Sequence, residues 1–217
     1  MGQVLIFKEA DFSANAVSLD NVYDVVKETG VPSPGSPMVS GNNNSYYNSI
    51  PLDKTVKVYA VAFTLPSDIL AYFTYLDGNE EKVWFTEGSI KVGVCNPSTG
   101  ALIGSEVTTS VNYLYTEVKA KYEAGENVGG TTQIVRLSSP VTVDEGTCVS
   151  FGIRRKSGDN SNNRIAVYSN DVAYDNPKGL MVTVGELPPP APGEPGAPDK
   201  YTNLAVTFYG EVVETDD

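Results

Sequence analysis

Two segments decide the fold: Ile90-Lys91-Val92-Gly93-Val94 and Thr147-Cys148-Val149-Ser150-Phe151-Gly152-Ile153. In the first, every second residue is a branched apolar one, and in the second Val149, Phe151 and Ile153 form a similar apolar row. Alternation with a period of two buries one face of a pleated sheet and leaves the other face to water. Both segments are therefore predicted to be strands.

Turn signals separate these strands from several others. Asn96-Pro97-Ser98-Thr99-Gly100 follows the first segment, and extended apolar patterns recur over 54–64, 133–137 and 204–213. Many short strands divided by turn residues are typical of antiparallel sheets packed in two layers. The sequence therefore predicts an all-β fold, an antiparallel jelly-roll or Greek-key β-sandwich with an extended amino-terminal arm.

Three regions are expected along the chain. Residues 1–30 are interpreted as an amino-terminal arm or docking segment, and residues 53–217 as the jelly-roll sandwich. Residues 31–52 are predicted to form one long loop, because this range contains Pro32, Pro34 and Pro37, and prolines lack the N–H donor that a central strand needs. Residues 70–76 and 82–85 are predicted to be strands, and 114–122 is predicted to be a strand with a helical turn at its end as the alternative.

The charge balance excludes some classes of partner. The chain has 27 acidic and 15 basic residues, a net charge of −12 that repels phosphate backbones and anionic lipid surfaces. No apolar run is long enough for a membrane-spanning helix. The first residues also lack the basic region and the long apolar core of an export signal. Neither a nucleic acid nor a membrane is expected as a partner.

The residue types needed for common catalytic sites are missing or scattered. The sequence contains no histidine, which excludes Ser-His-Asp and Cys-His machinery and histidine metal sites. No phosphate-binding glycine loop or dinucleotide fingerprint is present. The carboxylate pairs Glu80-Glu81, Asp144-Glu145 and Asp216-Asp217 fall in turns or at a terminus, where solvated loop charge is the simpler interpretation. We expect no catalytic residue, no metal site and no cofactor, and therefore no enzyme.

Two cysteines, Cys95 and Cys148, are present. By the strand phases above, both point away from the apolar rows. They would be able to pair if their strands were neighbours, and otherwise they are two free thiols. The sequence leaves these two alternatives open.

Aromatic residues near loops and strand ends are the best signal of a binding surface. We expect exposed rings that can stack on sugars or anchor a protein interface with little loss of side-chain entropy. The alternative is that they are ordinary half-buried aromatics of a sheet. The candidate ligand-binding residues are Tyr46, Tyr47, Trp84, Tyr113 and Tyr115.

The segment Phe7-Lys8-Glu9-Ala10-Asp11-Phe12-Ser13-Ala14-Asn15-Ala16-Val17 resembles an amino-terminal signature of virion proteins from Bacteroidetes phages of the crAss-like type. Those are capsid decoration, head-fibre or tail-fibre-like proteins with a jelly-roll module. The resemblance covers this short segment only. It implies a non-enzymatic structural or adhesion component of a virion that assembles in the host cytoplasm, with an extracellular or cell-surface location as the alternative.

Under this interpretation the protein works through contacts. Its expected partners are other virion proteins or further copies of itself, a trimer being one option, and a host-surface glycan is a further candidate. Val4, Leu5, Ile6, Phe7 and Phe12 are predicted to make the protein contact, since a strand at a free terminus can add to the edge of another sheet. The second interpretation is a carbohydrate-binding β-sandwich module that uses loop aromatics.

Overall fold

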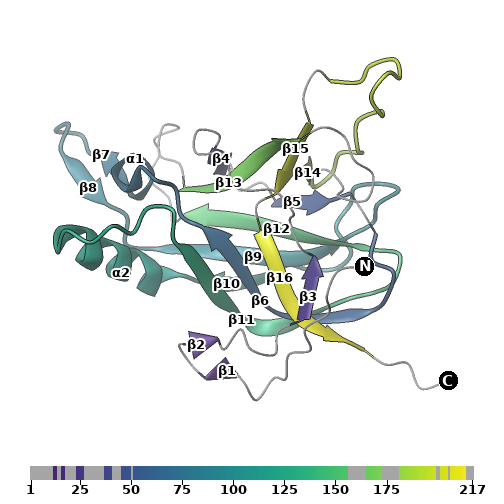
Figure 1. The fold of residues 1–217 in the computed structure, drawn as a ribbon, viewed down its shortest axis with the longest axis horizontal. Helices are drawn as coiled ribbons and strands as arrows, with labels where there is room; N and C mark the ends of the chain where they lie inside the picture. Colours follow the sequence, from purple (N-terminus) through teal and green to yellow (C-terminus); the bar gives the residue numbers. More distant parts are fainter. Residues whose placement is uncertain are drawn as a thin grey trace.

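The chain folds mostly into antiparallel strands, as its computed structural model shows (Figure 1). The structure describes residues 12–13, 16–17, 23–26, 37–40, 45–49, 51–155, 165–172, 181–198, 201–204 and 206–213. Within these residues the strands form a five-stranded sheet, a four-stranded sheet and three smaller ones. The prediction of an antiparallel, mainly β fold is confirmed at this level.

The five-stranded sheet contains both alternating segments. In it β9 pairs with β12, so that Ile90 lies opposite Ile153 and Val92 lies opposite Phe151. The two apolar rows therefore lie side by side on one face of the sheet, which explains why that face is buried. In order across the sheet, the strands are β10 (Val107–Ser110), β9 (Gly88–Cys95), β12 (Cys148–Arg155), β5 (Ser45–Asn48) and β14 (Met181–Thr183).

The four-stranded sheet is built around β6, whose sequence is rich in β-branched and aromatic residues. The last strand of the chain returns to this sheet and places Phe208 opposite Val61 of β6. In order across the sheet, the strands are β11 (Thr132–Val143), β6 (Val56–Thr64), β16 (Val206–Val212) and β3 (Tyr23–Val26).

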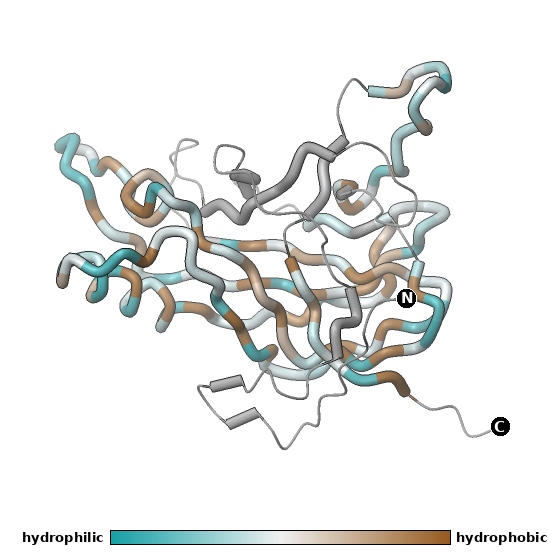
Figure 2. Tube along the Cα trace, in the orientation of Figure 1, coloured by the Kyte–Doolittle hydropathy of each residue, from teal (hydrophilic) through white to brown (hydrophobic). Residues whose placement is uncertain are grey.

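The two large sheets pack against each other across one apolar core. The ring of Phe151 in the first sheet lies 6.1 Å from the ring of Phe63 and 6.3 Å from that of Phe208, both in the second. Apolar residues recur along the strands of both sheets (Figure 2). Full burial of a side chain such as Phe151, which is 0% exposed, stabilises the fold by about 1.5–3 kcal/mol.

Two strands lie inside the range predicted as a loop. β5 occupies 45–48 within the five-stranded sheet, and β4 (Pro37–Ser40) pairs with β13 (Ile165–Val172), which also pairs with β15 (Tyr201–Leu204). The prediction of a continuous loop over 31–52 is therefore wrong at these strands. Pro37 is tolerated because it is the first residue of a strand at the edge of its described sheet.

The range predicted as an arm also contains strands. β3 is hydrogen-bonded to β16, so residues 23–26 belong to the four-stranded sheet. β1 (Phe12–Ser13) and β2 (Ala16–Val17) pair with each other. The range predicted as an arm therefore includes one strand of the four-stranded sheet, β3.

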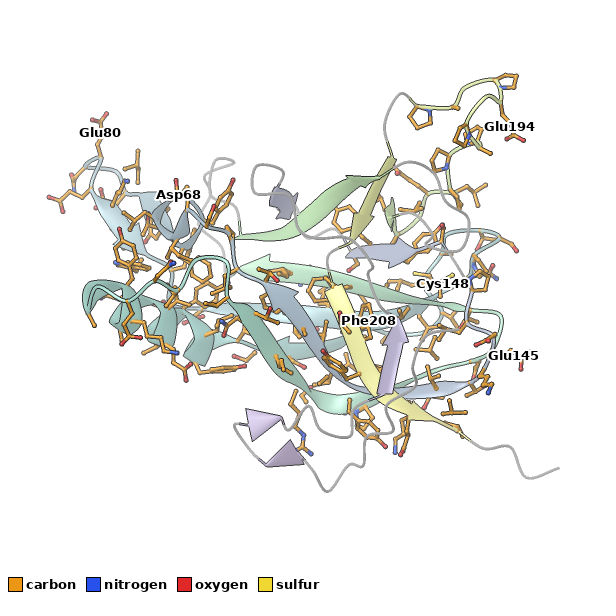
Figure 3. The ribbon with its side chains drawn as sticks, viewed as in Figure 1. Asp68, Glu80, Glu145, Cys148, Glu194 and Phe208 are labelled. Atoms are coloured by element: carbon orange, nitrogen blue, oxygen red, sulfur yellow. The ribbon has the colours of Figure 1, made fainter. Side chains whose placement is uncertain are left out.

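The strand predicted over 70–76 is wrong in its first half. Residues Ile69–Phe73 form the short helix α1, and only Thr74–Leu76 form a strand, β7, which pairs with β8 (Lys82–Trp84). Asp68 explains the difference, because its side-chain oxygen accepts a hydrogen bond of 3.0 Å from the N–H of Ala71 and caps the helix (Figure 3).

The strand predicted over 114–122 is wrong, because Asn112–Glu123 form the helix α2. Its buried residues Leu114, Tyr115 and Val118 share one helical face. Gly125, with φ of 79°, ends the helix in the left-handed conformation that glycine adopts without strain. The N–H of Gly125 bonds to the carbonyl of Tyr122, and the N–H of Glu126 bonds to that of Lys121, which is a Schellman motif.

Candidate functional site

Both described helices and the β7–β8 hairpin lie at one end of the two large sheets, on the left of Figure 1. We call this part, residues 69–85 and 112–133, the helical end. Asn112 ties the start of α2 to the five-stranded sheet, since its side-chain oxygen accepts a 3.0 Å hydrogen bond from the N–H of Gly88. The helix is thereby held in place at the start of β9.

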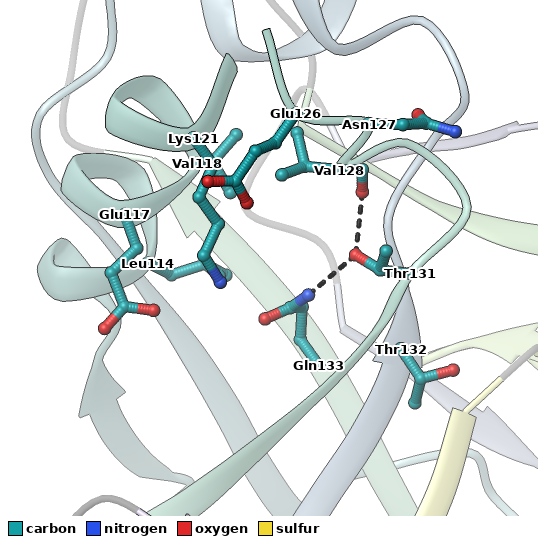
Figure 4. A pocket seen from close by; sticks show the side chains of 10 residues that line it. All are labelled: Leu114, Glu117, Val118, Lys121, Glu126, Asn127, Val128, Thr131, Thr132 and Gln133. Atoms are coloured by element: carbon teal, nitrogen blue, oxygen red, sulfur yellow. Dashed lines mark hydrogen bonds between the residues drawn. The ribbon is translucent and has the colours of Figure 1, made fainter. Parts of the chain in front are cut away.

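A pocket of about 370 Å³ lies between α2 and the beginning of β11 (Figure 4). Its apolar part comes from Leu114 and Val118 on the helix and from Val128 on the following loop, all three buried. The Schellman motif at Gly125 reverses the chain, so that residues 126–128 form the wall opposite the helix. The local sequence after α2 therefore creates the concave shape.

The polar wall of the pocket is held by a chain of hydrogen bonds. Nε2 of Gln133 donates to Oγ1 of Thr131 over 2.9 Å, and this hydroxyl donates to the carbonyl oxygen of Val128 over 2.7 Å (Figure 4). This chain orients the Gln133 amide. Its side-chain oxygen has no partner among the described residues and can accept a hydrogen bond from a ligand.

Three charged side chains line the same pocket: Glu117 and Lys121 from α2, and Glu126 from the loop. Figure 4 shows Lys121 extending from the helix into the space beside Gln133. Within the described part of the chain, none of the three is in an ion pair with another side chain. Two carboxylates and one ammonium make the pocket mildly acidic, and they offer both acceptors and donors.

Tyr113 neighbours Glu117, one of the residues that line this pocket. It is one helical turn before Glu117, and residues four apart on a helix are neighbours on its surface. Burial and then the nearby Glu117 charge raise the pKa of the Tyr113 phenol, which agrees with that placement. The side chain is nevertheless 48% exposed, so part of its ring is open to a ligand.

The other predicted aromatics are less exposed than expected. Tyr47 is 0% exposed and Tyr115 is 2% exposed, so the expectation of open rings is wrong for both. Tyr47 lies in β5, which is paired on both sides, with β12 and with β14. Tyr115 faces inward, with its ring 5.4 Å from that of Phe73. Tyr46 is half-buried against the main core.

Trp84 is half-buried, and its ring packs edge-on against Tyr122 of α2 with 5.5 Å between centroids. This contact joins the β7–β8 hairpin to the helix. Tyr122 is 39% exposed and was not among the predicted site residues. The Trp84 indole thus stabilises the packing of the hairpin on α2, and only part of its surface is exposed to solvent.

The two cysteines lie directly opposite each other on β9 and β12, and both are free and buried. They face away from the main core, as the strand phases predict, in a small cluster with Tyr47 and Val182. Burial raises the pKa of Cys95 to about 11, with the Ser150 side chain acting in the opposite direction. Burial, and then the charge of Cys95, raise the pKa of Cys148 to about 12, so neither thiol is a ready nucleophile.

Sequence reasoning missed Glu117, Lys121 and Gln133, which together with Tyr113 form the candidate site. The available signal was Gly125 after a run of helix-forming residues, which favours a helix that ends there. Among the described residues, no three histidine, cysteine, aspartate or glutamate side chains are grouped so that they could hold a metal ion.

The predicted contact residues Val4, Leu5, Ile6 and Phe7 lie outside the described residues. Phe12 is in β1, but its side chain is likewise outside the described part. Comparison with known proteins finds no matching family model, no similar curated protein and no similar solved structure. In the portion of the chain that the structure describes, no helix combines the length and the apolar character needed to cross a bilayer.

Proposed function

We propose that the chain is a non-enzymatic structural or adhesion component of a phage virion, such as a capsid decoration, head-fibre or tail-associated protein, acting through protein–protein contacts. The amino-terminal signature at 7–17 supports this class. We also propose that the two facing sheets belong to a jelly-roll or Greek-key sandwich. The last strand of the chain, β16, lies between β6 and β3, the strand of this sheet that comes first in the sequence, and such a return is typical of these folds.

The observation that carries the proposal is the position of β3. It pairs on one side with β16 and has no described strand on the other, so it is the outer strand of the four-stranded sheet within the described residues. Outer strands offer unpaired N–H and C=O groups to another chain. The predicted contact residues, Val4 to Phe7 and Phe12, precede this strand in the sequence, which suits docking on a neighbouring virion protein or a second copy.

The experiment compares the full chain with a variant lacking residues 1–11. This deletion removes Val4 to Phe7 and keeps β3, so the four-stranded sheet stays complete. We expect light scattering to show an oligomer for the full chain, and a monomer with the same circular dichroism spectrum for the variant. A monomer in both cases, or the same oligomer in both, contradicts the proposed docking role.

A second candidate function is carbohydrate binding, with a location on the virion or outside the cell. One specific observation favours it: the half-exposed Tyr113 lies one helical turn before Glu117, which lines a pocket with hydrogen-bonding side chains. In a virion protein such a site would recognise a host-surface glycan. The two functions are compatible, because the pocket and β3 belong to different parts of the fold.

A further inference from the structure

We propose that the pocket between α2 and β11 binds one neutral hexose unit of a glycan, with Tyr113 packed against the sugar ring and Glu117, Lys121 and Gln133 bonding its hydroxyl groups. This inference specifies the second candidate function. It does not depend on assembly into a particle, so it can fail or succeed independently of the docking role proposed for Val4 to Phe7 and Phe12.

The size of the pocket suits one ring. Its volume of about 370 Å³ lies near the lower end of the 300–1,000 Å³ that is common for small-molecule sites. An extended peptide would need a longer groove or an open strand edge, whereas this space is closed on opposite sides by the helix and by residues 126–128. A single cyclic ligand, or the terminal unit of a chain, is the form that fits.

The charges of the pocket favour a neutral ligand. Glu117 and Glu126 outnumber Lys121, and the whole chain carries a net charge of −12. A phosphate, sulfate or carboxylate would be repelled both at the site and during approach. A ligand with no formal charge meets no such barrier.

The hydrogen-bonding groups match hydroxyls. A hydroxyl both donates and accepts, so it is satisfied best where acceptors and donors lie close together. The carboxylate of Glu117 accepts, the ammonium of Lys121 donates, and the orientation of Gln133 by Thr131 leaves its amide oxygen free to accept. Bonds to charged groups are the stronger ones, which suits a ligand that must give up its own hydration.

The aromatic and aliphatic surfaces match the other side of a sugar. One face of a hexose presents C–H groups, which pack on an aromatic ring or on branched side chains. Tyr113, one helical turn before Glu117, offers such a ring next to the pocket, and Leu114, Val118 and Val128 form the apolar part inside. Polar and apolar faces are therefore both supplied within one pocket.

The test screens the full chain against glucose, galactose, mannose and N-acetylglucosamine by saturation-transfer NMR. Glucuronic and sialic acids serve as anionic probes. We expect at least one neutral sugar to bind and the acids to bind at least about 5-fold more weakly. If no neutral sugar binds, or if the acids bind as well as the neutral sugars, the proposal is wrong.

Variants then locate the site. Tyr113→Ala and Gln133→Ala should each weaken binding about 5-fold or more, whereas Tyr113→Phe, which keeps the ring, should bind within about 2-fold of the parent. Tyr122→Ala is the matched control, because it removes an exposed tyrosine of the same helix outside the pocket. Thermal unfolding confirms that each variant is folded. Equal losses for Tyr113→Ala and Tyr122→Ala, or no loss for the pocket variants, would place the sugar elsewhere and overturn the assignment.

Discussion

The hydroxyl of Tyr47 donates a 2.8 Å hydrogen bond to the backbone carbonyl oxygen of Glu186. Tyr47 lies in β5 and Glu186 in the turn after β14, so one buried phenol fastens a loop to the outer face of the five-stranded sheet. The N–H of Gly185 adds a 2.7 Å bond to the carbonyl of Gly100, which attaches the turn after β9 to the same loop. Two loops that are remote in sequence are thereby held together.

Replacing Tyr47 by phenylalanine should lower the free energy of unfolding by about 1 kcal/mol, since the carbonyl of Glu186 loses its donor while the ring stays in place. Urea unfolding measures the change. Tyr122→Phe is the control and should stay within about 0.5 kcal/mol, because that ring is partly exposed. An equal effect at both positions would show that the hydrogen bond from the Tyr47 hydroxyl contributes nothing to the free energy of unfolding.

Alkaline pH should destabilise the fold through the small cluster that contains Tyr47, Cys95 and Cys148. Burial raises the pKa of Tyr47 from 10.0 to about 12, that of Cys95 from 9.0 to about 11, and that of Cys148 from 9.0 to about 12. The unfolded chain therefore loses these protons at a lower pH than the folded chain. The stability they contribute is complete below a pH of about 9 and declines as the pH rises towards 11 and 12.

Urea unfolding at several pH values from 8 to about 11 measures this decline. A variant with Cys95→Ala and Cys148→Ala should lose stability less steeply above a pH of about 9, since two of the three groups are gone. If parent and variant have the same pH dependence, the thiols are not its source.

The thiols themselves should be unreactive in the native protein. Cys95 and Cys148 are each 0% exposed, and their raised pKa values keep them protonated at neutral pH. An aromatic disulfide reagent should therefore label neither cysteine in buffer at neutral pH and both in denaturant. Rapid labelling of the folded chain would contradict the burial of this cluster.

Gly100→Ala should destabilise the protein more than Gly146→Ala. Both glycines have positive φ values, 68° and 79°, so both substitutions carry the left-handed penalty of about 1–2 kcal/mol. An added Cβ at Gly100 would also lie only 2.1 Å from the carbonyl oxygen of Glu186, whereas nothing lies within 4 Å of one at Gly146. The extra cost should be about 1–3 kcal/mol, by analogy with overpacked sites. Thermal unfolding compares the two, and equal midpoints would show that the turn moves freely.

Glu106→Gln should cost about 3 kcal/mol of stability, in the range found for buried pairs that lose one partner. The Glu106 carboxylate accepts a hydrogen bond from the Ser45 hydroxyl. It also forms an ion pair with Lys91, with 3.0 Å between Nζ and Oε2, and the Lys91 side chain is 14% exposed. Glu123→Gln breaks the exposed pair with Lys119 and should cost less than about 0.5 kcal/mol. Chemical unfolding of the two variants tests the contrast, and similar losses would mean that Lys91 reaches solvent when its partner is neutral.

Local sequence was enough for the strands of the core. The alternation in 90–94 and 147–153 predicts β9 and β12 and their buried face, because a period of two is a property of a few consecutive residues. It also places Cys95 and Cys148 on the opposite face. Which strands pair, and so whether the two thiols meet, is decided by long-range contacts.

Helix and strand were confused where local signals compete. The run 114–122 contains two tyrosines and a valine, which suggest a strand, but it becomes α2 because its apolar residues bury one helical face and Gly125 ends it. Tyr47 and Tyr115 look like loop-end aromatics in the sequence, yet both are buried because neighbouring strands or a helix cover them.

The candidate pocket depended most on tertiary structure. Glu117, Lys121 and Gln133 form no motif along the chain. They line one pocket only because α2, the chain reversal at Gly125 and the start of β11 pack together. Sequence patterns reflect the conformational preferences of residues that are close together in the chain, so they predicted strands and the face of each strand that is buried. A pocket forms where segments that are distant in the sequence pack together. The residues that line it can therefore be identified only from the tertiary structure.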